Sequence, residues 1–549
     1  MRRYLGGRMG DVDFLLIAQS EVVRYEAYSQ LPLDRLDLYR ELVFPRMVHL
    51  GGAFRSHLDV INLCRRSLPP GDGPCRSDDL LSVWNLPSCA GVHLANYLLA
   101  HGIRTCIINN FDAEWGRICA VYSACKQPPL VGISTTFHLA WTELKRMVRK
   151  LRGFAPDMEI AAGGAFVHAQ TLAAEPPAFE KPMRRIGIDY VLHGFHAEND
   201  LLGLLMARRH GSGLAQVPNL AYLERRQTRA EFHVTPSRWN APVLGEVPFR
   251  WDRLELPFVH GTLQVRTSCG CPFSCAFCSY PKVAHGFQTM DRDAVARLLE
   301  SAFRVPGVRR LCFIDDTFNV PAARFRQICR LLMPYQCEWY SFLRVQFLDD
   351  QTARLMRDSG CQAVYLGIES ANDVVLGNMN KRATRKDFER GVALLKKHGI
   401  ASVAAFVLGF PGETQATIRD DLDFIENSGV DFYTLKEFYY MAHTPVHQQR
   451  EKYQLVGMGN QWAHATMDSP TAYRFKTEMF RTIQSAIYLD ADTSLWYLVA
   501  LCDAGFSLGE IRRLQREINL LTQDQMRGEF SDSHPALGRL KQLLAARSS

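Results

Sequence analysis

Three closely spaced cysteines stand in the stretch Arg266-Thr-Ser-Cys-Gly-Cys-Pro-Phe-Ser-Cys-Ala-Phe-Cys-Ser-Tyr-Pro281, at Cys271, Cys275 and Cys278. A four-iron cluster normally takes one cysteine for each iron, so a loop with three cysteines leaves one iron open to bind a small molecule. The C-x3-C-x2-C spacing therefore predicts a catalytic [4Fe-4S] cluster rather than a centre that only stores electrons.

Zinc and disulfides are the two other uses of cysteine that this stretch could serve. A structural zinc site needs four ligands, but the nearest downstream histidine is His285 and the next cysteine is Cys312. The chain has 15 cysteines, an odd number for a disulfide framework, and most stand singly in apolar segments, which is typical of reduced intracellular thiols. The spacing favours the cluster over zinc, and Cys269 is interpreted as a structural cysteine.

Composition limits the class of protein. The chain has 549 residues, of which 47% are hydrophobic, and this length indicates about three domains. Because no run is apolar enough to span a membrane and no signal peptide is evident, we expect a cytoplasmic protein without a membrane partner. The net charge of +7 is spread over 64 basic and 57 acidic residues without a basic tract, which disfavours nucleic acid and is compatible with an anionic small-molecule substrate.

The second half of the chain alternates short apolar segments with amphipathic ones. Phe388, Val392 and Leu395 show the helical period before Gly399, and a similar pattern precedes Gly429. Six strand-helix units predict a parallel sheet that curls into a partial (β/α)6 TIM-like barrel, with its chemistry at the carboxyl ends of the strands. The expected strands are 263–267, 310–314, 338–344, 363–367, 402–408 and 432–438.

A second α/β unit is predicted upstream, as a doubly wound, Rossmann-like domain. A helix is expected over 91–100 and strands over 105–109, 130–134, 159–162 and 190–192, with 12–18 completing an edge. Ligands of such folds bind at the carboxyl ends of the strands, which here carry the small or polar residues Asn109, Ser134, Thr136, Gly163 and Gly164. The expected organisation is an N-terminal extension (1–82), this domain (83–225), a linker (226–257), the barrel (258–445) and a helical C-terminal cap (446–549).

The cysteine loop and the barrel together resemble the radical S-adenosylmethionine (SAM) enzymes over about 180 residues. The resemblance rests on the cysteine spacing with Phe277 before the last cysteine, on Asp315-Asp316-Thr-Phe-Asn319, on Arg344, on Gly367-Ile-Glu-Ser370 and on Leu408-Gly-Phe-Pro-Gly-Glu-Thr414. It implies that the open iron binds SAM and that one electron from the cluster cleaves it to a 5′-deoxyadenosyl radical.

The same resemblance implies roles for single residues and a partner. Asp316 or Glu369 would accept hydrogen bonds from the cofactor's ammonium or ribose hydroxyls, Arg344 would pair with its carboxylate, and Ser370 would be a further SAM contact. An electron donor such as flavodoxin or ferredoxin is expected as the partner.

The upstream unit is similar to the cobalamin-binding domain of cobalamin-dependent radical methyltransferases. The similarity lies in the run from Leu86 to Leu98, in Gly102 and in the strand that ends at Asn109. The motif that supplies an axial histidine in some cobalamin domains is replaced by Asn-Phe-Asp-Ala-Glu-Trp-Gly over 110–116. The resemblance implies cobalamin without a protein histidine ligand, contacted by Asn109 and with Ser134, Thr136, Gly163 and Gly164 along its nucleotide tail.

The resemblance implies a methyltransferase that uses two molecules of SAM, one to methylate cobalamin and one to generate the radical. The layout is most similar to the P-methyltransferases of phosphinothricin tripeptide biosynthesis, which act on an N-acetylated phosphinate amino acid in an antibiotic pathway. Cationic candidates for such a substrate are Arg266, Lys436 and His443, whereas His464 is interpreted as structural. The alternatives are a carbon methyltransferase acting on an aminoglycoside or tryptophan, and a peptide-modifying radical enzyme whose N-terminal domain is a docking module without cobalamin.

Overall fold

The computed structural model describes residues 12–21, 28, 30–68, 80–138, 140–172, 174–225, 230–490 and 494–546. These residues pack into two compact units. The first takes in the described parts of 1–23, 84–264 and 288–308, and the second those of 24–83, 265–287 and 309–549. The five ranges expected from the sequence stay predictions of domain organisation.

The first unit is built on a seven-stranded sheet of order β4-β1-β5-β6-β7-β8-β9. The neighbouring strands from β4 to β7 pair in parallel, whereas β8 pairs antiparallel with both β7 and β9. The expected strand at 12–18 pairs with β4 on one side and with β5 on the other, so its placement at an edge was wrong. The strands are β1 (Phe14–Ile17), β4 (Thr105–Ile108), β5 (Leu130–Ser134), β6 (Ile160–Gly163), β7 (Tyr190–Leu192), β8 (Leu220–Arg225) and β9 (Ala230–Val234).

Helices cover both faces of this sheet because its strand side chains alternate between two cores. Leu15 and Ile17 pack with α5 (Trp115–Ala124), α6 (Trp141–Phe154) and α8 (Glu180–Ile186). Phe14 and Leu16 pack on the other face, with α4 (Cys89–Ala100) and α9 (Glu198–His210). The doubly wound architecture is thereby confirmed.

Much of the expected linker belongs to the first unit. Its residues 226–229 lie outside the described residues, and 230–234 form strand β9. Trp251, in the 3-10 helix η6 (Trp251–Arg253), is fully buried, and its backbone N–H donates to Ser301 Oγ at 2.9 Å in helix α11 (Arg292–Arg304). This packing was not predictable from the sequence, because a proline-containing irregular segment shows no hydrophobic periodicity even when its side chains are buried.

The other seven-stranded sheet has the order β10-β13-β14-β15-β16-β17-β21, and all of its strands except β10 lie wholly in the second unit. All six expected barrel strands are present, and the pairs from β13 to β21 are parallel. The two-residue β21 was not expected, because a pair of residues carries no pattern. The strands are β10 (Thr262–Val265), β13 (Arg310–Phe313), β14 (Glu338–Leu343), β15 (Cys361–Glu369), β16 (Ala401–Leu408), β17 (Phe432–Glu437) and β21 (Ile487–Tyr488).

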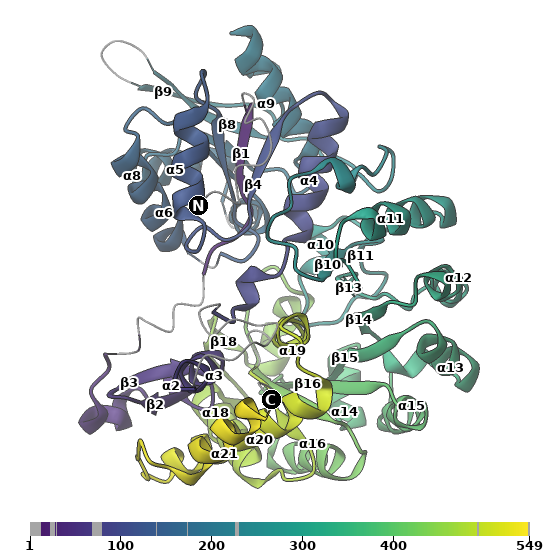
Figure 1. The fold of residues 1–549 in the computed structure, drawn as a ribbon. Coiled ribbons are helices and arrows are strands. Elements are labelled where there is room, and N and C mark those ends of the chain that lie inside the picture. The colour runs from purple at the N-terminus through teal and green to yellow at the C-terminus, as the bar shows by residue number, and fades with distance from the viewer. Residues whose placement is uncertain are drawn as a thin grey trace. The chain divides into compact units, whose positions relative to one another are not determined.

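Helices α12, α13 and α15 run along the outer side of this sheet (Figure 1). In α15, Phe388, Val392 and Leu395 are buried as expected, and Thr384 caps its first turn by accepting from the Asp387 N–H. The helices are α12 (Ala322–Leu332), α13 (Asp350–Asp358), α14 (Asp373–Asn378), α15 (Arg385–Lys397) and α16 (Gln415–Asn427).

The C-terminal region is helical, as expected, but also contains a three-stranded antiparallel sheet of β18 (Val456–Met458), β19 (Gln461–His464) and β20 (Met467–Asp468). No helix among the described residues is long and apolar enough to cross a membrane. The remaining helices are α17 (Arg450–Tyr453), α18 (Ser469–Thr482), α19 (Ser494–Asp503), α20 (Leu508–Met526) and α21 (Pro535–Ala545), with β2 (Met47–Leu50), β3 (Ala53–Ser56), α2 (Arg40–Val43) and α3 (His57–Arg66) from the N-terminal part of this unit.

A buried histidine joins the N-terminal and C-terminal parts of the second unit. His57 Nε2 donates to the carbonyl oxygen of Pro45 at 3.1 Å, and its Nδ1 accepts from Gln515 Nε2 at 2.8 Å. Gln515 Oε1 in turn accepts from Tyr497 Oη at 2.6 Å. Burial lowers the pKa of His57 to about 4, against the opposing effect of the Pro45 bond. The neutral imidazole is therefore the form that fits this network.

This histidine should make the unit less stable in mild acid. Its pKa is near 6.5 in an unfolded chain, so its contribution is complete above that pH and is lost as the pH falls toward 4, because the unfolded state then binds the proton. Between pH 7 and pH 5 the loss should be about 2 kcal/mol. His57→Leu should reduce the difference between the urea unfolding midpoints at the two pH values, whereas the exposed His210→Gln should not. An unchanged difference in His57→Leu would contradict this assignment.

Candidate functional site

The cysteine loop begins at the carboxyl end of β10, and two glycines close its base. Strand β11 (Ser268–Gly270) leads into the loop, and strand β12 (Phe287–Thr289) leaves it. Gly270 has φ +82°, and a Cβ atom there would come within 1.7 Å of the carbonyl oxygen of Gly286. Only glycine allows this approach, so the two ends of the loop are held together by backbone contact.

The three cysteines of the loop lie close together. Burial raises the pKa of the Cys278 thiol to about 11, and Cys275, Cys271 and Asp316 add to the increase. The three sulfur atoms nevertheless do not all lie within 4.8 Å of one another, whereas thiolates sharing one tetrahedral zinc ion are roughly 3.8 Å apart. The described cysteines are all free thiols. This spread suits a centre larger than a single metal ion.

Later parts of the chain hold the loop by its backbone. The Ala276 N–H donates to the carbonyl oxygen of Met379 at 2.8 Å, and the Ala276 carbonyl accepts from the Val446 N–H at 2.8 Å. Asn380 Nδ2 donates to the carbonyl oxygen of Ser274 at 2.9 Å and to its hydroxyl at 3.0 Å. The loop therefore takes its shape from the segments after α14 and before α17.

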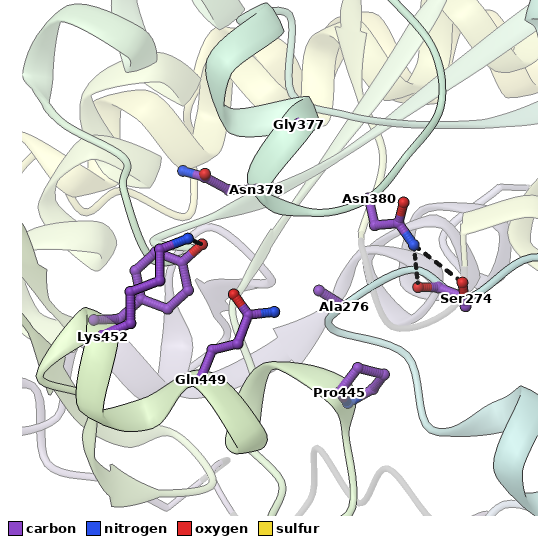
Figure 2. A pocket seen from close by; sticks show the side chains of 9 residues that line it. Ser274, Ala276, Gly377, Asn378, Asn380, Pro445, Gln449 and Lys452 are labelled. Atoms are coloured by element: carbon purple, nitrogen blue, oxygen red, sulfur yellow. Dashed lines mark hydrogen bonds between the residues drawn. The ribbon is translucent and has the colours of Figure 1, made fainter.

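A cavity of about 230 Å³ borders the loop on the side of these contacts (Figure 2). Figure 2 shows Lys452 and Gln449 projecting toward it from the η9–α17 segment, where η9 is the 3-10 helix Pro445–Gln449. Lys452 Nζ donates to Tyr453 Oη at 3.1 Å. The other lining residues are Ser274, Ala276, Gly377, Asn378, Asn380 and Pro445. The lining is about equally polar and apolar.

Arg344, expected to pair with a cofactor carboxylate, is buried against the cysteine loop. Its Nη2 donates to Cys275 Sγ at 2.8 Å and its Nη1 donates to the carbonyl oxygen of Lys381 at 3.0 Å. The guanidinium carbon lies 3.7 Å from the ring centroid of Phe273. The side chain of Arg344 therefore contacts a predicted metal ligand directly.

Glu369 ends β15 in the left-handed region, with φ +69°. Its Oε1 accepts from Lys381 Nζ at 3.0 Å, and the lysine side chain is only 4% exposed. A Cβ at Gly367 would come within 2.6 Å of the same carboxylate oxygen, so glycine leaves room for this pair. Sequence reasoning missed Lys381, because it follows a short helix rather than a strand.

The two aspartates after β13 have different surroundings. Asp315 accepts from the backbone N–H of Thr267 at 3.0 Å, from its hydroxyl at 2.9 Å and from the Ser268 hydroxyl, so it fixes the start of the cysteine loop. Burial raises the pKa of Asp316 to about 7, although a hydrogen bond from Tyr280 opposes the shift. Asp316 lies near Cys278, whose pKa it raises, and so belongs to the same site.

Ser370 points toward another carboxylate. Its hydroxyl donates to Asp421 Oδ1 at 3.0 Å, and burial raises the pKa of Asp421 to about 7. Glu413, in the turn after β16, is also buried, and burial together with Asp421 raises its pKa. The Gly409 N–H donates to Glu413. These bonds shape the turns after β15 and β16.

The segment after the barrel packs on the same turn. His464 Nε2 donates to the carbonyl oxygen of Gly409 at 3.0 Å, and the ring stacks on Trp462 with a centroid separation of 5.2 Å. This contact agrees with the structural role expected for His464. Of the cationic candidates, Lys436 is exposed near the end of β17 and His443 is half-buried, while Arg266 lies near Asp316 and lowers its pKa.

At the carboxyl edge of the first sheet, Asn109 holds the backbone that precedes α4. Its Nδ2 donates to the carbonyl oxygens of Trp84 and Leu86 at 3.2 Å, and its Oδ1 accepts from the Ser88 N–H at 2.8 Å. Gln19, after β1, donates to the same two carbonyls at 2.8 and 2.7 Å. Asn109 therefore shapes this edge from within.

The other predicted residues of this edge come together after β5 and β6. Ser134 Oγ and Thr136 Oγ1 are 3.0 Å apart. Gly164 has φ +115°, and a Cβ there would lie 3.1 Å from the Thr135 nitrogen and 3.3 Å from that of Thr136. Gly163 packs as closely on Leu192. The glycines thus allow the turns after β5 and β6 and strand β7 to approach one another closely.

Two buried polar groups that sequence reasoning missed lie at this edge. Ser20 follows β1 and His138 follows β5, and no described residue is a hydrogen-bond partner of the Ser20 hydroxyl or of either His138 ring nitrogen. Burial lowers the pKa of His138 to about 4, with Arg146 contributing. The gap between β1 and β5 is the point where the strand order reverses, which is where ligands of this fold bind. Orphaned groups there fit a large polar ligand, and neither carried a motif in the sequence.

Comparisons with known proteins agree with both units. Residues 265–425 match the family model of the radical SAM superfamily. An uncharacterized methyltransferase of Pyrococcus horikoshii is 27% identical over 317 residues, which make up 56% of this chain and 65% of the relative. The chain thus spans slightly less than two thirds of that relative.

Two solved structures share the fold over most of the chain. The radical SAM methyltransferase TsrM from Kitasatospora setae, with tryptophan and a SAM analogue bound, superimposes with a TM-score of 0.55 at 17% identity, covering 84% of this chain and 96% of that one. The cobalamin-dependent SAM radical enzyme OxsB, with aqua-cobalamin and SAM bound, also gives 0.55, at 13% identity and with 84% and 82% covered. The expected architecture is confirmed: residues 265–425 match the radical SAM family model, and the chain has the fold of these two solved structures.

Proposed function

We propose that this protein is a cobalamin-dependent radical SAM methyltransferase. The observation that carries the proposal is the loop of Cys271, Cys275 and Cys278 at the carboxyl end of β10, in a chain that also carries a doubly wound unit with orphaned polar groups at its switch point. The names of the relatives and of the solved structures support the same class of reaction. A reducing compartment, the cytoplasm, suits such a cluster.

When bound, the [4Fe-4S] cluster would supply the electron that cleaves SAM, and cobalamin would carry the methyl group. The residues of this chain bind and orient these groups. The three cysteines hold the cluster, and Asp316, Glu369 and Lys381 face the SAM site with hydrogen-bonding and charged groups. Ser20, Ser134, Thr136, His138 and Gly164 contact cobalamin, while Asn109, Gly163 and Ser370 shape the backbone around the two cofactors.

The acceptor we propose is the phosphorus of an N-acetylated phosphinate amino acid in antibiotic biosynthesis. Support comes from the resemblance of the layout to P-methyltransferases and from Arg266, whose charge lies near Asp316 at the cluster site. A guanidinium pairs well with a phosphinate. A one-electron donor of the flavodoxin or ferredoxin class completes the set of partners.

The acceptor can be tested directly with anaerobically reconstituted protein and SAM carrying a labelled methyl group. We expect label in a phosphinate amino acid, and none in tryptophan or an aminoglycoside, because neither carries a phosphinate group for Arg266 to pair with. Mass spectrometry of the products and counting of 5′-deoxyadenosine provide the readout. Label in tryptophan or the aminoglycoside instead would move the acceptor to carbon and retain the reaction class.

The cluster assignment predicts different results for neighbouring cysteines. Cys271→Ala, Cys275→Ala and Cys278→Ala should each lower bound iron well below about four per chain and abolish 5′-deoxyadenosine formation, because each removes a ligand. Cys269→Ala is the matched control and should retain both, since Cys269 lies in β11, next to the loop but outside the spacing. Full iron content in Cys275→Ala would refute the ligand set.

The cobalamin site can be tested separately, because it lies in the other unit. Gly164→Val would crowd the backbone nitrogens of Thr135 and Thr136 and strain the backbone at φ +115°, and His138→Phe would remove the orphaned imidazole. Both should lose the corrin absorbance and the roughly one cobalt per chain of the unaltered protein, while retaining cluster iron as a sign of folding. Gly153→Ala, in open space on α6, should behave like the unaltered protein. An unaltered chain without cobalt would instead favour a docking module.

A further inference from the structure

We propose that Arg344 is a positioning residue that sets the reduction potential of the cluster through its hydrogen bond to Cys275, rather than a ligand of the cofactor carboxylate. The inference rests on the proposed function, because it needs a cluster on Cys271, Cys275 and Cys278. The couple concerned is the gain of one electron by the cluster from an external donor, with no bond formed or broken in the protein.

The guanidinium of Arg344 is fixed on several sides. Nη2 donates to Cys275 Sγ at 2.8 Å, Nη1 donates to the carbonyl oxygen of Lys381 at 3.0 Å, and Phe273 covers the guanidinium plane at 3.7 Å. The backbone of Arg344 is held as firmly, because its N–H donates to Asn319 Oδ1 at 3.0 Å and its carbonyl accepts from Asn319 Nδ2 at 2.7 Å. Turning toward a ligand in the barrel would break both guanidinium bonds.

Another cation is available for a cofactor carboxylate. Lys381 lies next to Arg344 along this chain of contacts, and its ammonium already meets a carboxylate at 3.0 Å, that of Glu369. Lys381 therefore presents its carbonyl to Arg344 and its ammonium to the barrel residue that the SAM site is expected to include. The two cations thus have different roles: Arg344 faces a cluster sulfur, and Lys381 faces the SAM site.

A donor on a cluster sulfur favours the reduced state. Reduction adds negative charge that is shared with the thiolate sulfurs, and hydrogen bonds to these sulfurs are among the features that set cluster potentials. A charged donor forms a stronger bond than a neutral one, and burial reduces screening by water. Arg344 should accordingly raise the potential and make the cluster easier to reduce.

The test is an anaerobic redox titration of the reconstituted full-length chain, with dithionite and mediators and with the reduced cluster measured by electron paramagnetic resonance, normalised to iron. At a fixed potential near the midpoint, Arg344→Gln should lower the ratio of reduced to oxidised cluster at least tenfold, a shift of 59 mV for one electron. Arg344→Lys retains the positive charge but lacks the two guanidinium nitrogens that reach Cys275 and Lys381. The ratio of reduced to oxidised cluster in this variant should therefore lie between those of Arg344→Gln and the unaltered protein. Lys452→Gln, at the cavity on the loop, is the matched control and should leave it unchanged.

The other outcomes of the titration would contradict the role proposed for Arg344. An unchanged ratio in Arg344→Gln with a full complement of iron would overturn the inference and leave the proposed function intact. Lower iron in the variant with an unaltered potential for the iron that remains would assign Arg344 a role in loop folding only, which also overturns it. If the unaltered chain binds no cluster, the proposed function fails together with the inference.

Discussion

Parallel pairing of the strands from β13 to β21 is the constraint on which the candidate site depends. Because every strand in such a sheet runs the same way, the residues that follow the strands meet at one edge. Asp316 after β13, Arg344 after β14 and Glu369 at the end of β15 are far apart in sequence and are collected around the cysteine loop by this geometry. The close approach of Gly270 to Gly286 then holds the two ends of the loop together.

The charged side chains next to the cysteine loop are connected by a chain of hydrogen bonds. Arg344 reaches Cys275, the carbonyl of Lys381 holds Arg344, and the ammonium of Lys381 meets Glu369. A buried charge is tolerated when it is paired and hydrogen-bonded. Lys381 and Glu369 form such a pair, and Arg344 is held by hydrogen bonds to a sulfur and a carbonyl oxygen. Burial raises the pKa of both Asp316 and Cys278, so these two groups hold their protons more tightly than free side chains do.

The fold was largely predictable because its signals are local. Apolar segments and stop residues predicted eleven of the fourteen strands in the two seven-stranded sheets, since each signal depends only on neighbouring residues. The position of β1 inside its sheet, strand β9 in the expected linker and the two-residue β21 were not predictable, because pairing partners that are distant in sequence decide them. Lys381, Ser20 and His138 were missed for the same reason: only packing shows that they are buried beside a strand end.

By itself the sequence predicted the type of centre, since cysteine spacing sets how many irons can be ligated, and it determined the two α/β units through their hydrophobic periods. Tertiary structure alone decided what the single residues do. The place of Arg344 after a strand is equally compatible with a contact to a cofactor carboxylate. The packing of its guanidinium between Phe273, Lys381 and Cys275 instead directs it to a sulfur, because a buried fork of donors bonds to whatever acceptors the folded chain brings within about 3 Å.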